Sequence, residues 1–213
     1  DHGLLAVDPP KDAPNEPAAK AGADEVAAGN FLRAVAKQLM LDPALVLPAY
    51  EDTYHYLLLE RQLPANVDPL DSKLADPLAR ARLRRLFGEG LTKIAGHVLP
   101  LAKLAHDDVW RSSPWRFREG HCFLLPGDSP LGLRLPLATL PWADPDDPDG
   151  DDVARTAMCA EARGGILHVF MPPAQTLDDY AELLAAVEAT AKELATTVRI
   201  EGYTPPRDPR LIV

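Results

Sequence analysis

The final third of the sequence contains its most restrictive feature, two apolar runs that meet at a pair of glycines. The runs read TAMCAEAR and ILHVFMPP, and Gly164 and Gly165 separate them. Adjacent glycines between strand-like runs are typical of a two-residue β-turn, because such a turn needs positive φ angles at both central positions. The sequence therefore predicts a β-hairpin that turns at Gly164-Gly165 and places Glu161 opposite His168 on one face of the sheet.

An amphipathic helix and a further strand are predicted after this hairpin. The helix lies in TLDDYAELLAAVEATAKEL, where Thr176 is the expected N-cap and Asp178 and Asp179 suit the positive end of the helix dipole. The strand lies in TTVRIEGYTPP, where Val198 and Ile200 share one side. A hairpin, a helix and a strand in this order predict a sheet with one packed helix, and therefore an α+β fold.

The first two thirds of the chain show a mainly helical pattern. Residues 1–29 are rich in Pro, Ala and charge, which is typical of a linker or a loosely ordered arm. We expect one helix after an N-cap at Asn30, and two more at about 50–62 and 77–87. The expected domain organisation is an arm at 1–29, a helical region with a β-hairpin at 30–142, an acidic linker at 143–152, and the start of a truncated ligase-like domain at 153–213.

A loop rich in turn-forming residues, PGDSPLG at 126–132, lies between two strand-like runs. It is either a catalytic loop, with Ser129 or Asp128 reacting beside His121 and Cys122, or the turn of a second hairpin. The strand-turn-helix signature GxSxG of a serine nucleophile is missing. The sequence therefore favours a structural turn, in antiparallel pairing with the alternating leucines of LGLRLPL.

Composition narrows the classes of partner. The formal net charge is −10, from 32 acidic and 22 basic residues, which disfavours binding to nucleic acid or to an anionic membrane surface. No apolar stretch is long enough to span a bilayer, and no signal peptide is evident, so we expect a cytoplasmic protein. Cys122 and Cys159 lie far apart in apolar runs, which is typical of buried free thiols.

Two sets of polar residues could carry chemistry. Glu161 and His168 could hold a metal or move a proton, or they could form an ordinary cross-strand polar pair, which the residues alone favour. His55 follows Glu51 and Asp52 at helical spacing. That second set lacks a further ligand nearby, so a surface or interface cluster is favoured over a metal site.

Six segments of the chain are long and unusual. They are YEDTYHYLLLERQLPANVDPLDSKL, RARLRRLFGEGL, WRSSPWRFREG, FLLPGDSPLGLRLPLATLPW, LHVFMPP and IEGYTPPRDPRL. Together they resemble a bacterial family of amidoligase domains that follow a transglutaminase-like domain in one large cytoplasmic protein. The resemblance covers the chain from about residue 30 onward. It implies a partial glutamine-synthetase-like ligase sheet.

The resemblance also implies an activity. Ligases of this kind use ATP and Mg²⁺ to convert a carboxylate into an acyl phosphate, which an amine then attacks. Glutamates on sheet strands hold the metal, so the resemblance makes Glu161 the first candidate metal ligand and Glu201 the second. The transglutaminase-like domain is the implied partner, and a peptide or amino acid is the implied substrate.

The strands and glycine-rich loop that the family places after IEGYTPPRDPRL are absent from this chain. We therefore expect a fragment that is inactive and binds neither ATP nor metal in isolation. The alternative function is a non-catalytic module at 30–142 that docks a peptide or the neighbouring domain, with Trp110 and Trp115 as anchors. For these tryptophans, burial in an ordinary core is favoured over either functional interpretation.

Overall fold

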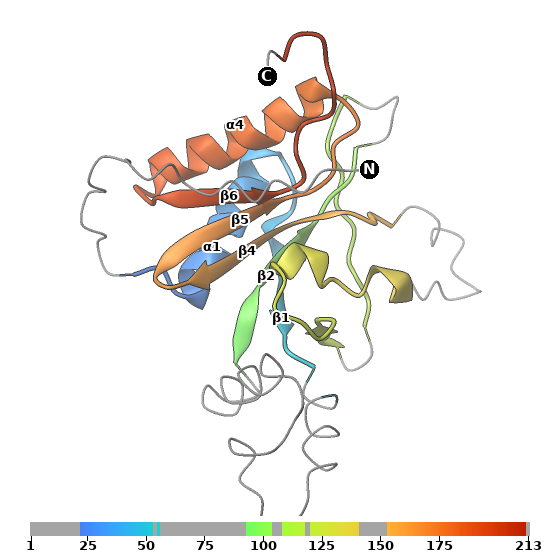
Figure 1. Ribbon diagram of the computed structural model, residues 1–213, viewed down its shortest axis with the longest axis vertical. Coiled ribbons are helices and arrows are strands. Elements are labelled where there is room, and N and C mark those ends of the chain that lie inside the picture. The colour runs from blue at the N-terminus through green and yellow to red at the C-terminus, as the bar shows by residue number, and fades with distance from the viewer. Residues whose placement is uncertain are drawn as a thin grey trace, which may run out of the picture.

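A six-stranded mixed sheet organises the chain in a computed structural model (Figure 1), which describes residues 22–52, 55, 93–103, 108–117, 120–140 and 153–211. The strand order is β3-β1-β2-β4-β5-β6, and only the pairs β1–β3 and β5–β6 are parallel. Together with the helices this confirms the predicted α+β class. The strands are β1 (Leu47–Tyr50), β2 (Ile94–Pro100), β3 (Cys122–Phe123), β4 (Ala157–Arg163), β5 (Ile166–Met171) and β6 (Val198–Gly202).

The hairpin β4–β5 forms as predicted. Gly164 and Gly165 have φ angles of 58° and 78°, the left-handed region that a two-residue turn requires. Glu161 is the registered partner of His168. The helix that follows, α4 (Leu177–Glu193), has Thr176 as its N-cap, and its capping box is closed by Asp179.

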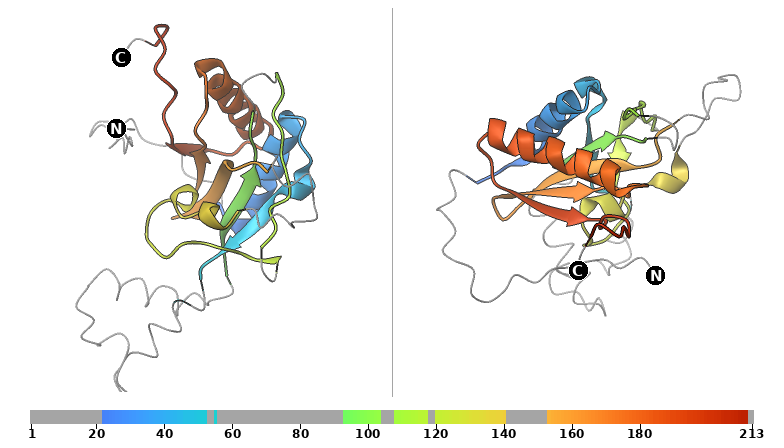
Figure 2. Two further views of the ribbon diagram at one scale, coloured as in Figure 1. Left: turned by 90° about the vertical axis from the view of Figure 1, so that its right-hand side faces the viewer. Right: turned by 90° about the horizontal axis from the view of Figure 1, so that it is seen from above.

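Two helices, instead of the one expected, cover one face of the sheet (Figures 1 and 2). They are α1 (Glu25–Gln38) and α4, which lie side by side in the view from above. Their apolar residues Phe31 and Leu183 are fully buried against sheet residues such as Leu99 and Met171. The segment 122–140 covers part of the opposite face. There Leu131 belongs to a second apolar cluster, together with sheet residues such as Val98 and Phe170.

Several boundaries differ from the sequence-based expectations. Helix α1 begins at Glu25, inside the expected arm, because Oδ1 of Asp24 accepts a hydrogen bond from the backbone N–H of Ala27 at 2.7 Å and caps the helix there. Asn30 therefore lies within the helix. Tyr50 ends strand β1, so the helix expected at about 50–62 does not begin there; His55 is helical, and the rest of that helix after residue 52 lies outside the described residues. The expected helix at 77–87 and linker at 143–152 lie outside the described residues.

The second predicted hairpin is wrong. After the two-residue strand β3, the chain forms 3-10 turns at η3 (Leu131–Leu133) and η4 (Leu137–Thr139) in place of a strand. Pro130 and Pro136 precede these turns, and a proline has no N–H to donate to a strand ladder. PGDSPLG nevertheless reverses the chain, because the N–H of Leu125 donates to the carbonyl of Arg134 at 2.7 Å.

Strands from both parts that the sequence had separated enter the same sheet. Strand β2 belongs to the range 30–142 and β4 to 153–213, and the two strands pair antiparallel. Among the described helices, none is both long and apolar enough to cross a membrane.

A buried histidine lies under α1. His97 on β2 is 5% exposed, and a Cβ on Gly29 of α1 would lie 2.7 Å from its Nε2 atom, so glycine lets the helix pack this closely. Its Nδ1 atom has no hydrogen-bond partner among the described residues. Burial lowers the pKa of His97 to about 4; the charge of Arg33 adds to this effect and that of Glu25 opposes it.

This histidine predicts a loss of stability in acid. The unfolded side chain, with its ordinary pKa of 6.5, binds a proton more tightly than the folded one, so stability falls as the pH drops from about 6.5 to about 4. The expected loss is about 3 kcal/mol from this residue. Urea unfolding of wild type and of His97→Leu at pH 7 and pH 4 measures it. Equal pH dependence in the two proteins would contradict the assignment.

Candidate functional site

A polar cavity of about 460 Å³ lies where β2 begins and β4 ends. Charged side chains dominate its lining. Its acidic residues are Glu25, Glu51, Asp128 and Glu161, and its basic residues are Lys93, Arg134 and Arg163. The cations are already paired with carboxylates, since Lys93 contacts Glu25 at 2.8 Å, Arg134 contacts Glu51, and Arg163 contacts Glu201.

Glu161 is the carboxylate best suited to bind an additional ligand in this cavity. Its side chain is 16% exposed, and its Oε1 atom accepts a hydrogen bond from the backbone N–H of Leu131 at 3.0 Å. Burial raises the pKa of Glu161, against the opposing effect of that hydrogen bond and of Arg163. Both polar contacts of this carboxylate with described residues use Oε1, so Oε2 remains available to a cation.

The η3 turn holds Leu131 in position over Glu161. Gly132 lies against the ring of Phe170 on β5, and a Cβ at that position would be 2.1 Å from Cδ1 of Phe170. Only glycine permits such a close approach. The apolar side chain of Leu131 is buried beneath the same turn, and its N–H points to the carboxylate.

Arg163 joins the three site residues predicted from the sequence. Its Nε atom lies 3.5 Å from Oε1 of Glu161, and its Nη2 atom contacts both Oε2 of Glu201 and Nδ1 of His168, the latter at 2.7 Å. Burial lowers the pKa of His168, with a further contribution from Arg163. A neutral His168 can accept the arginine's hydrogen bond at Nδ1.

Glu201 brings a second carboxylate to the same face from the edge strand β6. Its Oε2 atom contacts Arg163 and lies 3.3 Å from Nδ1 of His168. Its Oε1 atom is buried and has no hydrogen-bond partner among the described residues. Such an atom is costly to bury unless a cation or a water reaches it. Glu161, His168 and Glu201 thus lie together, although no hydrogen bond joins Glu161 directly to His168.

A buried ion pair supports the other side of the cavity. The Arg134 guanidinium donates to both carboxylate oxygens of Glu51, from Nη1 at 3.0 Å and from Nη2, and its Nε donates to the carbonyl of Leu125 at 2.8 Å. The side chains of Arg134 and Glu51 are 9% and 8% exposed. Of the set Glu51, Asp52 and His55 singled out in the sequence, Glu51 is therefore engaged by Arg134. The backbone N–H of His55 donates to Oδ1 of Asp52 at 3.1 Å.

The two cysteines among the other sequence candidates do not offer a thiolate nucleophile. Ser129 and Asp128 line the cavity, but burial raises the pKa of Cys122 to about 12 and that of Cys159 well above its ordinary value, so both thiols stay protonated. The ring of His121 packs on that of Phe123, at 5.8 Å between centroids.

The donor set fits one part of a metal site. Carboxylate oxygens are the ligands that Mg²⁺ prefers, and Glu161 and Glu201 each offer one without a partner. The ranges described here contain no group of three or more His, Cys, Asp or Glu residues that could hold a metal ion. Further ligands would have to come from outside these ranges.

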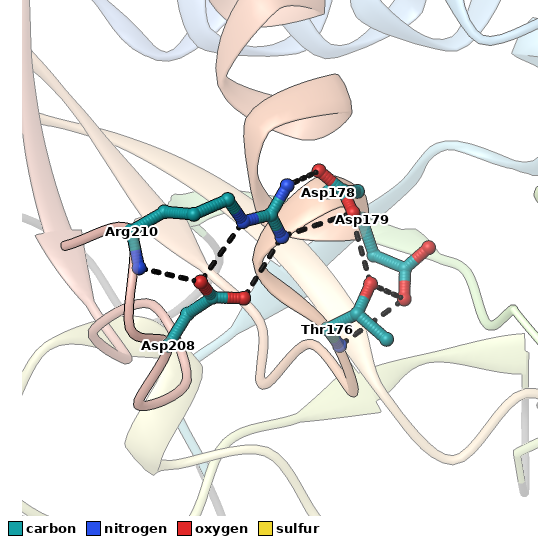
Figure 3. A network of polar contacts seen from close by, with 5 residues as sticks. All are labelled: Thr176, Asp178, Asp179, Asp208 and Arg210. Carbon is teal, nitrogen blue, oxygen red and sulfur yellow. Dashed lines mark hydrogen bonds and ion pairs between the residues drawn. The ribbon is translucent and has the colours of Figure 1, made fainter.

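The segment after β6 is anchored to the start of α4 (Figure 3). The Arg210 guanidinium lies between Asp208 and Asp178, with contacts of 2.8 to 3.1 Å. Its hydrogen bonds to Asp208 and then Asp178 raise the pKa of Arg210. Asp179 instead points toward Thr176 in the figure, so the two adjacent acids of α4 act on different sides of the helix.

The fold and the site together define an α+β protein in which the carboxylates of Glu161 and Glu201 lie on the sheet face opposite the helices. A family model described as "Putative amidoligase enzyme (DUF2126)" matches residues 9–152 and 146–213. The chain therefore belongs to this amidoligase family. No curated protein and no solved structure matches the chain.

Proposed function

We propose that this chain is part of an ATP-dependent carboxylate–amine ligase. One observation carries the proposal: in a chain of the amidoligase family, two carboxylates with unpaired oxygens lie together on one sheet face, one of them lining a charged cavity. In such a ligation, a substrate carboxylate oxygen bonds to the γ-phosphorus and ADP leaves. The amine then bonds to the acyl carbon, phosphate leaves, and the amine loses a proton.

Glu161 and Glu201 would hold Mg²⁺ in this proposal, and Mg²⁺ would supply positive charge to the phosphates. Arg163 currently neutralises both carboxylates. Its side chain is 41% exposed, so it can rotate toward solvent when a cation binds. The η3 turn covers one side of Glu161, where the buried Leu131 donates its backbone N–H to the carboxylate, and so keeps bulk water from that side.

The described residues supply two donors, Glu161 and Glu201, which are too few for a ligase metal centre, and we propose that the remaining ligands come from a longer protein that contains this chain. Calorimetry tests this point. The 213-residue chain should bind Mg·ATP negligibly, whereas the intact protein should bind it. Micromolar, Mg²⁺-dependent binding by the chain alone would contradict the proposal. The resemblance further supports a transglutaminase-like domain of the same bacterial protein as the partner, a peptide or amino-acid substrate, and a cytoplasmic location.

Arg163 provides a prediction on metal affinity. If its guanidinium competes with the cation for Glu161 and Glu201, Arg163→Gln should strengthen Mn²⁺ binding to the intact protein about tenfold, because one charge-assisted interaction is removed from the competing state. Electron paramagnetic resonance of free Mn²⁺ measures the change. The exposed Arg155→Gln, at the other end of β4 from Glu161, is a matched control. Weaker Mn²⁺ binding in Arg163→Gln would show that the arginine does not compete.

Ser129 gives a prediction of the opposite kind. It lines the cavity, and its hydroxyl forms no hydrogen bond with a carboxylate or histidine among the described residues, so Ser129→Ala should change the activity of the intact protein by about twofold at most. Steady-state ADP release measures this. A loss of about a thousandfold in a folded variant would make Ser129 a catalytic residue.

A further inference from the structure

A second cavity, of about 470 Å³, lies at the other end of strands β2 and β4 from the Glu161 cavity. Segments from four parts of the chain line it, together with Asp179 of α4. They are residues 102–103 after β2, 110–113, 153–156 before β4, and 173–175 before α4. The cavity includes the WRSS motif, which the proposed ligase function does not use.

Hydrogen bonds between the segments make the walls of this cavity rigid. The backbone N–H of Ala154 donates to Oγ of Ser113 at 2.8 Å, and Nε1 of Trp115 donates to the carbonyl of Ala154 at 2.7 Å. Arg111 and Ala102 exchange two backbone hydrogen bonds of 2.8 and 2.9 Å. Trp115 is therefore a core residue, 8% exposed, and not a docking anchor. The cavity exists before any ligand binds.

The charge of the lining is positive, in contrast to the net charge of −10 for the whole chain. Lys103 is neutralised by Glu182 and Asp179, each at 2.9 Å, and these two hydrogen bonds raise its pKa. Arg155 is exposed and forms no hydrogen bond or ion pair with any described residue, and the exposed Arg111 lines the same cavity. Such a lining favours an anion.

Apolar groups complete the cavity. Trp110 donates from Nε1 to Oε2 of Glu182 at 3.0 Å, which fixes the orientation of its indole ring. Val153, Pro173 and Ala174 add apolar surface nearby. A ligand that fills this space therefore needs an apolar body as well as a negative group.

We propose that this cavity binds a small organic anion, in which a carboxylate or phosphate pairs with Arg155 and an apolar body packs against Trp110. The proposal does not depend on the ligase activity, since none of the residues that line this cavity belongs to the Glu161 cluster.

Matched probes test this proposal on the 213-residue chain by calorimetry. N-acetylphenylalanine has the required carboxylate, N-acetylphenylalanine amide has the same body without the charge, and phenyl phosphate carries the alternative anion. We expect at least one of the two anions to bind with a submillimolar Kd. The amide should bind at least about tenfold more weakly, because it lacks one charge-assisted hydrogen bond. Comparison of the two anions identifies the preferred group.

Two variants locate the binding. Arg155→Gln should weaken binding of the anionic probe about tenfold. The melting temperature should not change, because Arg155 is exposed and forms no hydrogen bond or ion pair with a described residue. Arg199→Gln, an exposed arginine on β6, should leave the affinity unchanged. Absence of binding by both anions, equal affinity for acid and amide, or full affinity in Arg155→Gln would overturn the proposal.

Discussion

If Glu161 is the metal ligand that we propose, replacing it with glutamine should reduce the proposed ligase activity of the intact protein by about a thousandfold or more, because the loss of such a ligand removes several kcal/mol of transition-state stabilisation. The fold should tolerate the change. Glutamine keeps an oxygen for the backbone N–H of Leu131, and burial already raises the pKa of Glu161, so a neutral side chain suits the site. The melting temperature of the 213-residue chain should hardly change.

A matched control for this variant is Glu188→Gln. Glu188 lies on the exposed side of α4, paired with Lys192, and its loss should affect neither activity nor folding. A Glu161→Gln protein that melts several degrees lower and keeps its activity would show that Glu161 and its neighbours form a structural polar cluster.

Replacing Arg134 with methionine is expected to lower the free energy of unfolding by about 3–5 kcal/mol, because it leaves a buried carboxylate without its counter-ion. Glu51 would lose two hydrogen bonds and the carbonyl of Leu125 one. Urea unfolding of the 213-residue chain at pH 7 measures the change.

The double variant Glu51→Gln/Arg134→Met separates the ion pair from the packing around it. Because it removes both charges, it should be more stable than Arg134→Met alone. A cost below about 1 kcal/mol for the single variant would mean that the pair behaves as an exposed ion pair.

Local signals explain what the sequence could predict. The hairpin needs positive φ angles at two adjacent residues, and Gly164-Gly165 supplies them within apolar runs of strand length. Helix α4 carries its own start signal in Thr176 and Asp179. Once the turn is known, residue counting alone places Glu161 opposite His168.

The remaining features depend on contacts between distant segments. A strand would place the alternating leucines at 131–137 on one face, but Leu131 and Leu135 are buried while Leu133 and Leu137 are 38% and 36% exposed. Two prolines prevent a ladder, so the backbone forms 3-10 turns. Periodicity alone cannot separate these two structures.

The site residues that the sequence analysis missed are arginines. Arg134 meets Glu51 across 83 positions of sequence, and Arg163 meets Glu201 across 38. No local pattern encodes such pairs. Arg163 alone had a usable signal, because it lies two residues after Glu161 on the same strand and therefore on the same face.

The most direct test of the proposed ligase is ADP release by the intact protein, measured with Mg·ATP and a panel of amino acids and peptides as carboxylate and amine donors. The proposal predicts ADP release that requires both a carboxylate and an amine, with one amide bond formed per ADP, and its loss in Glu161→Gln. Amide formation without ATP consumption, or ADP release that continues unchanged in Glu161→Gln, would contradict it.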